Sequence, residues 1–564
     1  MLKQAVLCLL LLCFFGHADA SDTTQAGTLK HVKVAIASAH PLATQAGLEI
    51  INKGGNVFDA AVAVSAALAV VEPSGSGLGG GGYWLLHRAK DGFETMLDGR
   101  EKAPLAASKD MFLDKNGKVT PGLSQNGALA AGIPGLPAAL VHLSNKYGQL
   151  SLAESLAPAI QYAKTGFAVG DKYLKSLKSR SDILIKNPES TAIFFNNGQL
   201  PPRYSILRQH DLANTLTQLA KFGRDGFYDG DIADKLVKSV IKSGGIWSKQ
   251  DLLSYQIIER APVKGEYHGI KITSSAPSSS GGIVLLEALN ILSDYNLQKA
   301  SATTRKHLIT EALRRAYHDR ALYLGDSDFI DIPVSRLLSQ DYAAGIRSSI
   351  RADKALASRM LSGEIHDPSE GSHTTHFSII DDQGNRVAAT LSINSPFGAG
   401  FVAAGTGVLL NNEMDDFSSQ TGAMNGYGLV GGAANAIAPG KRMLSSMSPA
   451  FLETSKHIAV LGTPGGSRII SMVLLAALDF SEGNHNPKSW VNVPRFHHQY
   501  LPDVIEYEKG ALSSEELAGL AGMGHSLKET SRPYGDMQAV LWNKETKTLA
   551  AASDPRGAGK ASVE

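Results

Sequence analysis

The segment from Thr374 to Gly398 reads like the start of a catalytic chain, although it lies about two-thirds of the way along the sequence. Thr374, Thr375 and His376 open an apolar strand, FSII, and a DDQGN turn leads to a second strand, RVAATLSI. A threonine hydroxyl becomes a strong nucleophile when a base removes its proton, and a free α-amino group on the same residue is such a base. The segment therefore predicts that the chain cuts itself before Thr374, which then acts as a nucleophile.

Four more segments are rich in polar, charged or glycine residues. They are LDGREKAP (97–104), NNEMDDF (411–417), LSSMSP (444–449) and GTPGGSRI (462–469). With the segment at Thr374, they resemble the γ-glutamyltranspeptidase family, also called glutathione hydrolases, whose members are N-terminal nucleophile hydrolases. The five motifs occur in the family's order and span nearly all of the chain after its first few dozen residues. One position departs, because the family usually has threonine where this chain has Ser392.

The resemblance implies the catalytic groups. Thr374 would be the nucleophile, and Ser392 would hydrogen-bond its hydroxyl. Serine keeps the hydroxyl of the usual threonine but loses a methyl group that restricts rotation, so positioning would be looser. Gly465 and Gly466 would present backbone N–H groups to the oxyanion of a tetrahedral intermediate, an arrangement worth ~3–4 kcal/mol per donor.

The resemblance also implies how a γ-glutamyl group is bound. Such a group carries an α-carboxylate and an α-ammonium, so it needs a cation at one end and anions at the other. Arg100 has the planar fork suited to the carboxylate. The other expected substrate-binding residues are Ser445 and Ser446 for the carboxylate, and Glu413, Asp416 and Asn394 for the ammonium.

The acidic pair Asp415–Asp416 has a second interpretation, because neighbouring acids before FSSQ also suit a loop or helix cap. We expect one of the two to have that structural role. The long segment that follows is rich in glycine, asparagine and alanine. The resemblance implies that such a segment covers the glutamyl pocket, with Tyr427 as its aromatic residue.

The expected activity is acyl transfer without a cofactor. Thr374 would take the γ-glutamyl group of glutathione or a related compound and pass it to water or to an amino acid or peptide acceptor. Autocleavage would give pieces 21–373 and 374–564 that remain together as a heterodimer.

The alternative is a cephalosporin or glutaryl acylase of the same fold, but an acyl group without an amine would leave Glu413 and Asp416 unpaired. An exported binding protein that is not processed is a further alternative, whereas a serine hydrolase would need a G-x-S-x-G elbow that the chain lacks.

The first twenty residues resemble a secretory signal peptide. Lys3 precedes an apolar run from Ala5 to Phe15, and Ala18-Asp19-Ala20 is a small-x-small cleavage site. The run is about eleven residues, too short for a membrane-spanning helix of ~20. We therefore expect an exported protein, periplasmic or secreted, without a membrane span. Both cysteines lie in this segment, so the mature chain would have no disulfide.

Composition and element order complete the prediction. Hydrophobic residues make up 43% of the chain, charged residues 19%, and the net charge is +1, which describes a globular protein without the basic face of a nucleic-acid binder.

The glycines at 75, 77 and 80 match G-x-G-x-x-G, but they follow a helix and open a strand, so we reject a nucleotide site. His497-His498 lacks partners at ligand spacing, so we expect no metal. Strands dominate after residue 374 and helices before it, and the resemblance implies a four-layer αββα sandwich.

Overall fold

The computed structural model describes residues 32–361, 374–419, 425–426 and 428–564, and two β-sheets stacked between helices dominate this part of the chain. The first sheet has seven strands, in the order β20 (Lys560–Val563), β1 (Val34–Ser38), β9 (Thr375–Asp381), β10 (Arg386–Ser392), β2 (Gly81–Arg88), β3 (Phe93–Gly99) and β6 (Ile258–Arg260). The second has six, in the order β19 (Thr548–Ser553), β18 (Gln538–Asn543), β14 (His457–Gly462), β13 (Ala450–Glu453), β8 (Ile270–Ser274) and β7 (Val263–Tyr267).

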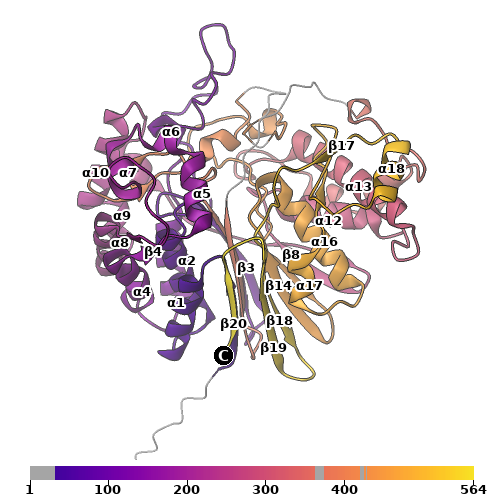
Figure 1. The fold of residues 1–564 in the computed structure, drawn as a ribbon, viewed down its shortest axis with the longest axis horizontal. Helices are drawn as coiled ribbons and strands as arrows, with labels where there is room; N and C mark the ends of the chain where they lie inside the picture. The colour runs from indigo at the N-terminus through magenta and orange to yellow at the C-terminus, as the bar shows by residue number, and fades with distance from the viewer. Residues whose placement is uncertain (1–31, 362–373, 420–424, 427) are drawn as a thin grey trace, which may run out of the picture. The chain divides into compact units, whose positions relative to one another are not determined.

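Helices cover the outer face of each sheet, so the predicted αββα sandwich is confirmed (Figure 1). The first sheet is covered by α1 (Pro41–Asn52) and α2 (Val57–Val71), with α3 (Leu136–Tyr147), α4 (Leu152–Thr165) and α8 (His210–Phe222) packed around them. The second is covered by α12 (Gly281–Leu292), α16 (Ile469–Ser481) and α17 (Pro487–Asn492), and α13 (Ala302–Tyr323) packs on α12.

Shorter elements connect these layers. The remaining helices are α5 (Asp171–Ser179), α6 (Ser181–Leu184), α7 (Pro188–Phe194), α9 (Asp225–Tyr228), α10 (Gly230–Lys242), α11 (Lys249–Ser254), α14 (Val334–Leu337), α15 (Gln340–Arg347) and α18 (Ser514–Gly522). Short strands form three small sheets: β4 (Phe167–Ala168) with β5 (Ile206–Leu207), β11 (Val402–Ala403) with β12 (Val408–Leu409), and β15 (Phe496–His497), β16 (Ile505–Tyr507) and β17 (Leu527–Glu529). No helix in the described ranges has the length and apolar character needed to cross a membrane.

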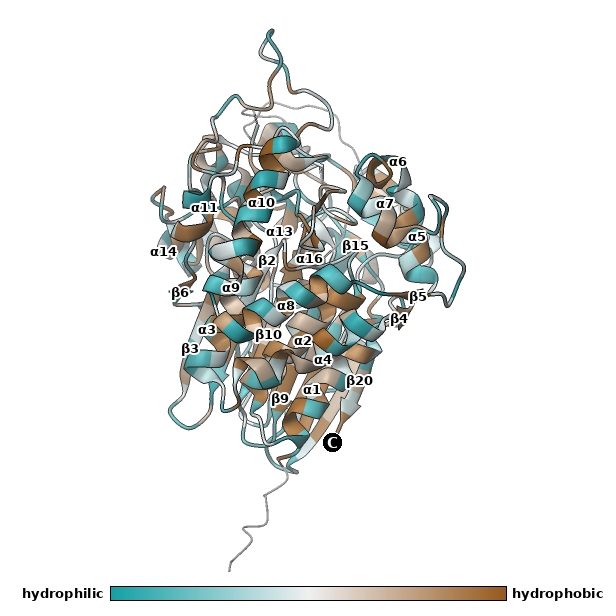
Figure 2. Ribbon diagram, turned by 90° about the vertical axis from the view of Figure 1, so that its left-hand side faces the viewer, coloured by the Kyte–Doolittle hydropathy of each residue, from teal (hydrophilic) through white to brown (hydrophobic). Residues whose placement is uncertain are grey.

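Helix α2 shows how the sequence specifies the inner packing. Its Ala- and Val-rich sequence has almost no polar face, and all fifteen of its residues are buried. A helix that is apolar all round belongs in a core, as the sequence predicted. The side chains of Asn56 and Asp59 form a capping box that satisfies the free N–H groups at its start. By contrast, α8 and α10 have hydrophilic stretches on the outer side of the layer (Figure 2).

The pairing of β9 with β10 positions the proposed nucleophile. Thr375 lies opposite Leu391 and His376 opposite Thr390. One step further, this antiparallel register places Thr374 opposite Ser392. Side chains in directly opposed positions have Cβ atoms about 4.5–5.5 Å apart. The fold therefore brings the two hydroxyls predicted for catalysis to the same end of the central sheet.

The glycine-rich loop before β2 serves backbone packing. A Cβ atom at Gly79 would lie 2.1 Å from the Leu409 carbonyl oxygen, and one at Gly80 would lie 2.1 Å from the Ser392 carbonyl oxygen. Only glycine permits these approaches. The loop therefore seats β2 beside the end of β10, in keeping with the rejection of a nucleotide site.

Candidate active site

Thr374 lines a pocket where the ends of several elements meet. It immediately precedes β9 and is buried. Nine of the ten predicted site residues line this pocket, and Gly465 lines a neighbouring cavity that also reaches Thr374. The pocket lining consists of Arg100, Arg320, Thr374, Ser392, Asn394, Glu413, Asp416, Leu429, Leu444, Ser445, Ser446, Met447, Gly466, Ser467 and Ile469.

Ser392 shares the pocket with Thr374 but has a different hydrogen-bond partner from the one predicted. Its Oγ accepts a hydrogen bond from the Asn394 backbone N–H at 2.7 Å, and among the described residues Ser392 forms no hydrogen bond with Thr374. This N–H occupies one lone pair of the Ser392 oxygen and leaves its proton available to donate. In the uncut chain Ser392 therefore lies opposite Thr374 without binding it.

Gly465 and Gly466 form a strained turn before α16. Their φ angles are +148° and +57°, values that L side chains rarely adopt, and a Cβ atom at Gly465 would lie 2.5 Å from Met472 Cε. Neither N–H donates to a carbonyl in the described part of the chain. Two backbone N–H groups that have no acceptor and lie beside a nucleophile are suited to form an oxyanion hole.

Charged groups in the pocket lining are paired with one another. Arg100 is almost fully buried, with Nη1 2.6 Å from Glu413 Oε2 and Nη2 2.5 Å from Asp416 Oδ2. The sequence analysis assigned the cation and the acids to opposite ends of a ligand, whereas the structure places them in direct contact. They pair because an unpaired buried charge is strongly unfavourable. A zwitterionic ligand can insert between them, since it supplies one carboxylate and one ammonium.

Burial controls the ionisation of these acids. Burial raises the pKa of Glu413 to about 7 and that of Asp416 to about 7, although the charge of Arg100 opposes both shifts. The two acids lie beside the same guanidinium, so they titrate as a coupled pair. The pocket is therefore ready to bind an ammonium group only at or above neutral pH.

This ionisation predicts the pH dependence of substrate affinity. An acid must be ionised to bind an ammonium group, so KM for a γ-glutamyl donor should fall as the pH rises to about 7 and level off above it. Well below the pKa, one titrating group changes affinity by ~10-fold per pH unit. Steady-state kinetics across this range should show a shallower acid limb for Glu413→Gln, which removes one of the two acids. An identical acid limb in wild type and variant would contradict this assignment.

The two neighbouring acids Asp415 and Asp416 have different roles, as expected. Asp415 accepts hydrogen bonds from Ser124 Oγ at 2.6 Å and from the Gly426 backbone N–H at 2.9 Å, so it organises the adjoining loop. Asp416 lines the pocket instead. Tyr427, expected above the pocket, lies outside the described residues, but Leu429 from the same segment contributes to the pocket wall.

A wider cavity of about 590 Å³ lies on the other side of Thr374. Between it and the start of β9, Lys172 Nζ binds both Glu72 and Asp536, at 2.5 and 2.7 Å, and Thr375 Oγ1 donates to Glu72. Six basic and three acidic side chains line this cavity: Lys172, Lys175, Arg203, Arg468, Arg532 and Arg556, and Glu72, Asp171 and Asp536. The sequence analysis did not identify this basic cavity, because its residues come from separate segments.

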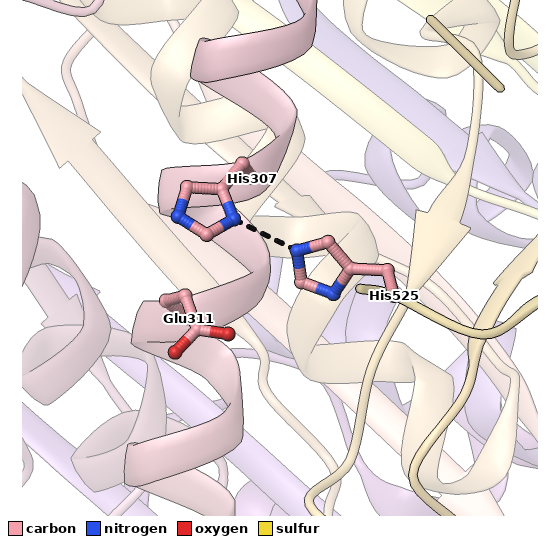
Figure 3. Close-up of side chains that lie close together, drawn as sticks. All are labelled: His307, Glu311 and His525. Carbon is pink, nitrogen blue, oxygen red and sulfur yellow. Dashed lines mark hydrogen bonds between the residues drawn. The ribbon is translucent and has the colours of Figure 1, made fainter. Parts of the chain in front are cut away.

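One group of side chains has residue types that bind metal ions, but positively charged arginines nearby disfavour a cation there. His307, Glu311 and His525 lie close together (Figure 3), and His307 Nδ1 is 2.8 Å from His525 Nε2. Arg314 and Arg315 each bind one oxygen of Glu311. A cation there would have to displace these guanidinium groups, so the contacts favour a structural histidine pair. In the His497-His498 pair, His497 contacts Ser471 and Gln499, and His498 contacts Asp503.

Comparison with known proteins identifies relatives along nearly the whole chain. The family described as Gamma-glutamyltranspeptidase matches residues 43–564. A glutathione hydrolase proenzyme of Pseudomonas sp. (strain A14) is 43% identical over 543 residues, covering 96% of this chain and 93% of that protein. A protein of the same name from Escherichia coli (strain K12) is 41% identical over 527 residues, covering 92% of this chain and 90% of that one.

Two solved structures show similar folds. The cephalosporin acylase from Bacillus halodurans aligns with a TM-score of 0.83 at 27% identity, covering 94% of this chain and 96% of that chain. The γ-glutamyltranspeptidase from Helicobacter pylori aligns with a TM-score of 0.57 at 41% identity, covering 59% of this chain and 97% of that chain. The acylase shares the architecture at 27% identity, whereas the curated relatives have higher sequence identity.

Proposed function

The chain belongs to the γ-glutamyltranspeptidase family, and on that premise we propose what each group in its pocket does. The enzyme is an autoprocessed γ-glutamyltranspeptidase and glutathione hydrolase. One observation carries the assignment of roles: the pocket around Thr374 contains a paired cation and two acids that together match the α-carboxylate and α-ammonium of a γ-glutamyl group.

Processing begins with the Thr374 hydroxyl. Its oxygen attacks the carbonyl carbon of His373, the amide bond between the two residues breaks, and the nitrogen takes up a proton to become the free α-amino group. Water then hydrolyses the resulting ester and releases the His373 carboxylate. We propose that the pieces 21–373 and 374–564 remain together as a heterodimer, because Arg100 and the residues from 374 onward contribute to the same pocket.

Catalysis uses the same hydroxyl with its new base. The α-amino group takes the Thr374 proton while Oγ1 attacks the γ-carbonyl carbon of the donor. The N–H groups of Gly465 and Gly466 stabilise the oxyanion, the C–N bond breaks, and the amine leaves with a proton. A γ-glutamyl ester remains on Thr374 until water or an acceptor amine attacks it.

A glutaryl donor distinguishes this function from an acylase. A glutaryl group lacks the α-ammonium, so Glu413 and Asp416 would lose the ligand group that they bind. A site with buried polar groups strongly rejects an analogue that leaves them unpaired. We expect kcat/KM for a γ-glutamyl anilide to exceed that for the glutaryl anilide by ~10²-fold or more. Faster release from the glutaryl compound would instead establish an acylase.

We propose that the leaving amine departs, and the acceptor enters, through the wide basic cavity. Lys175 and Arg532 line it, are exposed, and form no ion pair in the described ranges. Free cations beside a nucleophile favour peptides and amino acids that carry a carboxylate. The product of glutathione cleavage, cysteinylglycine, has such a group.

Reversing both charges tests this route. Wild-type enzyme should transfer to glycylglycine better than to its C-terminal amide, and Lys175→Glu/Arg532→Glu should reduce that preference ~3–10-fold, in keeping with exposed charge pairs. High salt should weaken the wild-type preference. Lys178→Glu is the matched control, since Lys178 lies on α5 but outside the cavity lining. An unchanged preference in the double variant would place the acceptor elsewhere.

We propose export for the enzyme, based on the signal-like composition of residues 1–20. The expected mature protein begins at Ser21 and is periplasmic or secreted.

A further inference from the structure

We propose that Arg320 is a positioning and binding residue of the γ-glutamyl pocket, which orients the Ser446 hydroxyl and adds a second guanidinium for the substrate α-carboxylate. The inference rests on the proposed function of the pocket and extends it to a residue outside the five sequence motifs. Arg320 lies on α13, one of the helices packed around the second sheet.

The contacts of Arg320 tie it to the serine segment of the pocket. It is 5% exposed, its Nε donates to Ser280 Oγ at 2.9 Å, and its Nη2 donates to Ser446 Oγ at 3.2 Å. Ser280 Oγ in turn donates to the Ser445 carbonyl at 2.6 Å. A single guanidinium thus holds the backbone of Ser445 through one hydroxyl and the side chain of Ser446 directly.

These contacts fix the direction of the serine protons. A serine hydroxyl has one proton to donate and two lone pairs to accept with. Ser446 Oγ accepts from Arg320, and Ser445 Oγ accepts from the Met447 backbone N–H at 3.1 Å. Neither hydroxyl donates to a group in the described part of the chain, so both protons remain available to a ligand. A carboxylate, which accepts hydrogen bonds only, is the complementary group.

The guanidinium of Arg320 forms no direct ion pair with a described residue, although the charge of Asp416 acts on it from a distance. On the same helix, Arg314 and Arg315 both pair with Glu311, but Arg320 forms no ion pair within the described residues. Burial lowers the pKa of Arg320 to about 10, so the side chain is still charged at neutral pH. Buried charges are ordinarily paired. An anion delivered by the substrate would supply the missing partner.

The third nitrogen of the guanidinium is placed to contact that anion. Nη1 of Arg320 donates to no group in the described ranges, and it is not among the polar atoms that are sealed inside the protein without a partner. Because Arg320 lines the pocket, this nitrogen is available to a bound ligand. Arg100 is already paired with Glu413 and Asp416, so Arg320 is the guanidinium that meets a carboxylate without first breaking an ion pair.

The test compares two donors in the wild-type enzyme and three variants. The donors are a γ-glutamyl anilide and its analogue with the α-carboxylate replaced by a carboxamide. The variants are Arg320→Gln, Arg320→Lys, and Arg315→Lys as a control at another buried arginine of α13. We expect Arg320→Gln to raise KM for the carboxylate donor ~10–100-fold, the range for hydrogen bonds to charged groups, with a smaller change in kcat. KM for the amide analogue should change little, and Arg320→Lys should recover part of the lost affinity for the carboxylate donor.

The preference for the carboxylate donor over its amide is the deciding quantity. If Arg320 only supports the fold, kcat/KM should fall by the same factor for both donors. The preference would then stay at the wild-type value, which would overturn the proposal. Addition of Ser446→Ala to Arg320→Gln should cost less than the sum of the single changes, because the two residues act on one carboxylate. Full additivity would also contradict it. Cleavage before Thr374 in every variant shows that processing is intact, and turnover of the γ-glutamyl anilide by the wild-type enzyme tests the proposed function separately. Failure of the proposed function would abolish turnover of that donor in the wild-type enzyme, whereas failure of the Arg320 proposal would leave the donor preference unchanged.

Discussion

Replacing Thr374 with alanine is expected to yield one uncut, inactive chain. The hydroxyl that attacks the His373 carbonyl and the hydroxyl that attacks the donor are the same group, so the change removes both processing and turnover. Loss of a catalytic nucleophile typically reduces kcat by ~10⁴–10⁶-fold. Denaturing electrophoresis should show a single band, and release of the anilide should fall to background.

Two neighbouring substitutions sharpen this prediction. Thr374→Ser keeps a hydroxyl and an α-amino group on one residue, so it should be cut and should retain activity. Thr375→Ala removes the hydrogen bond to Glu72 but leaves the nucleophile, and it should also be cut. Efficient cleavage of the Thr374→Ala chain would show that another group performs the attack.

Replacing Gly465 with alanine should have the next largest effect. A side chain at φ +148° is strained, and its Cβ would lie 2.5 Å from Met472 Cε. The methionine end can move aside, but the backbone strain remains, so we expect the turn to shift and its N–H groups to lose their alignment with the oxyanion. Loss of one oxyanion donor reduces kcat by ~10²–10³-fold in a well-studied case. We expect a reduction of that order with KM little changed, measured by steady-state kinetics on processed enzyme.

Gly483→Ala is the matched control for the glycine substitution. Gly483 also has a positive φ angle, +92°, but nothing lies within 4 Å of a Cβ placed there. Its replacement should cost some stability and leave kcat unchanged. Equal losses of kcat in both variants would show that backbone strain alone, and not the oxyanion hole, accounts for the effect.

The resemblance predicted which residues would share one pocket. Thr374, Gly466 and Arg100 come from separate motifs, and the fold brings their segments together. The burial of α2 was equally predictable, because its apolar residues leave no face for solvent. The sandwich itself followed from the resemblance and not from the order of strands and helices.

Other features depended on contacts that no local pattern encodes. Arg320 lies among several charged residues of α13, where an arginine resembles an ordinary helix surface charge. Only the packing of α13 against the serine segment shows that it is buried and linked to Ser446. The pairing of Arg100 with both acids was likewise unforeseen, since the sequence predicted the cation and the acids at opposite ends of a ligand. The basic cavity combines α5 with residues more than 350 positions later in the chain, such as Arg532.

The central claim is that Thr374 is both the processed N-terminus and the residue that carries the γ-glutamyl group. Intact mass spectrometry of purified enzyme, before and during turnover of a slow γ-glutamyl donor, tests it most directly. We expect two pieces, with the smaller beginning at Thr374 and gaining the mass of one γ-glutamyl group during turnover, and the larger beginning at Ser21. A full-length chain that is nevertheless active, or a γ-glutamyl group on the larger piece, would contradict it.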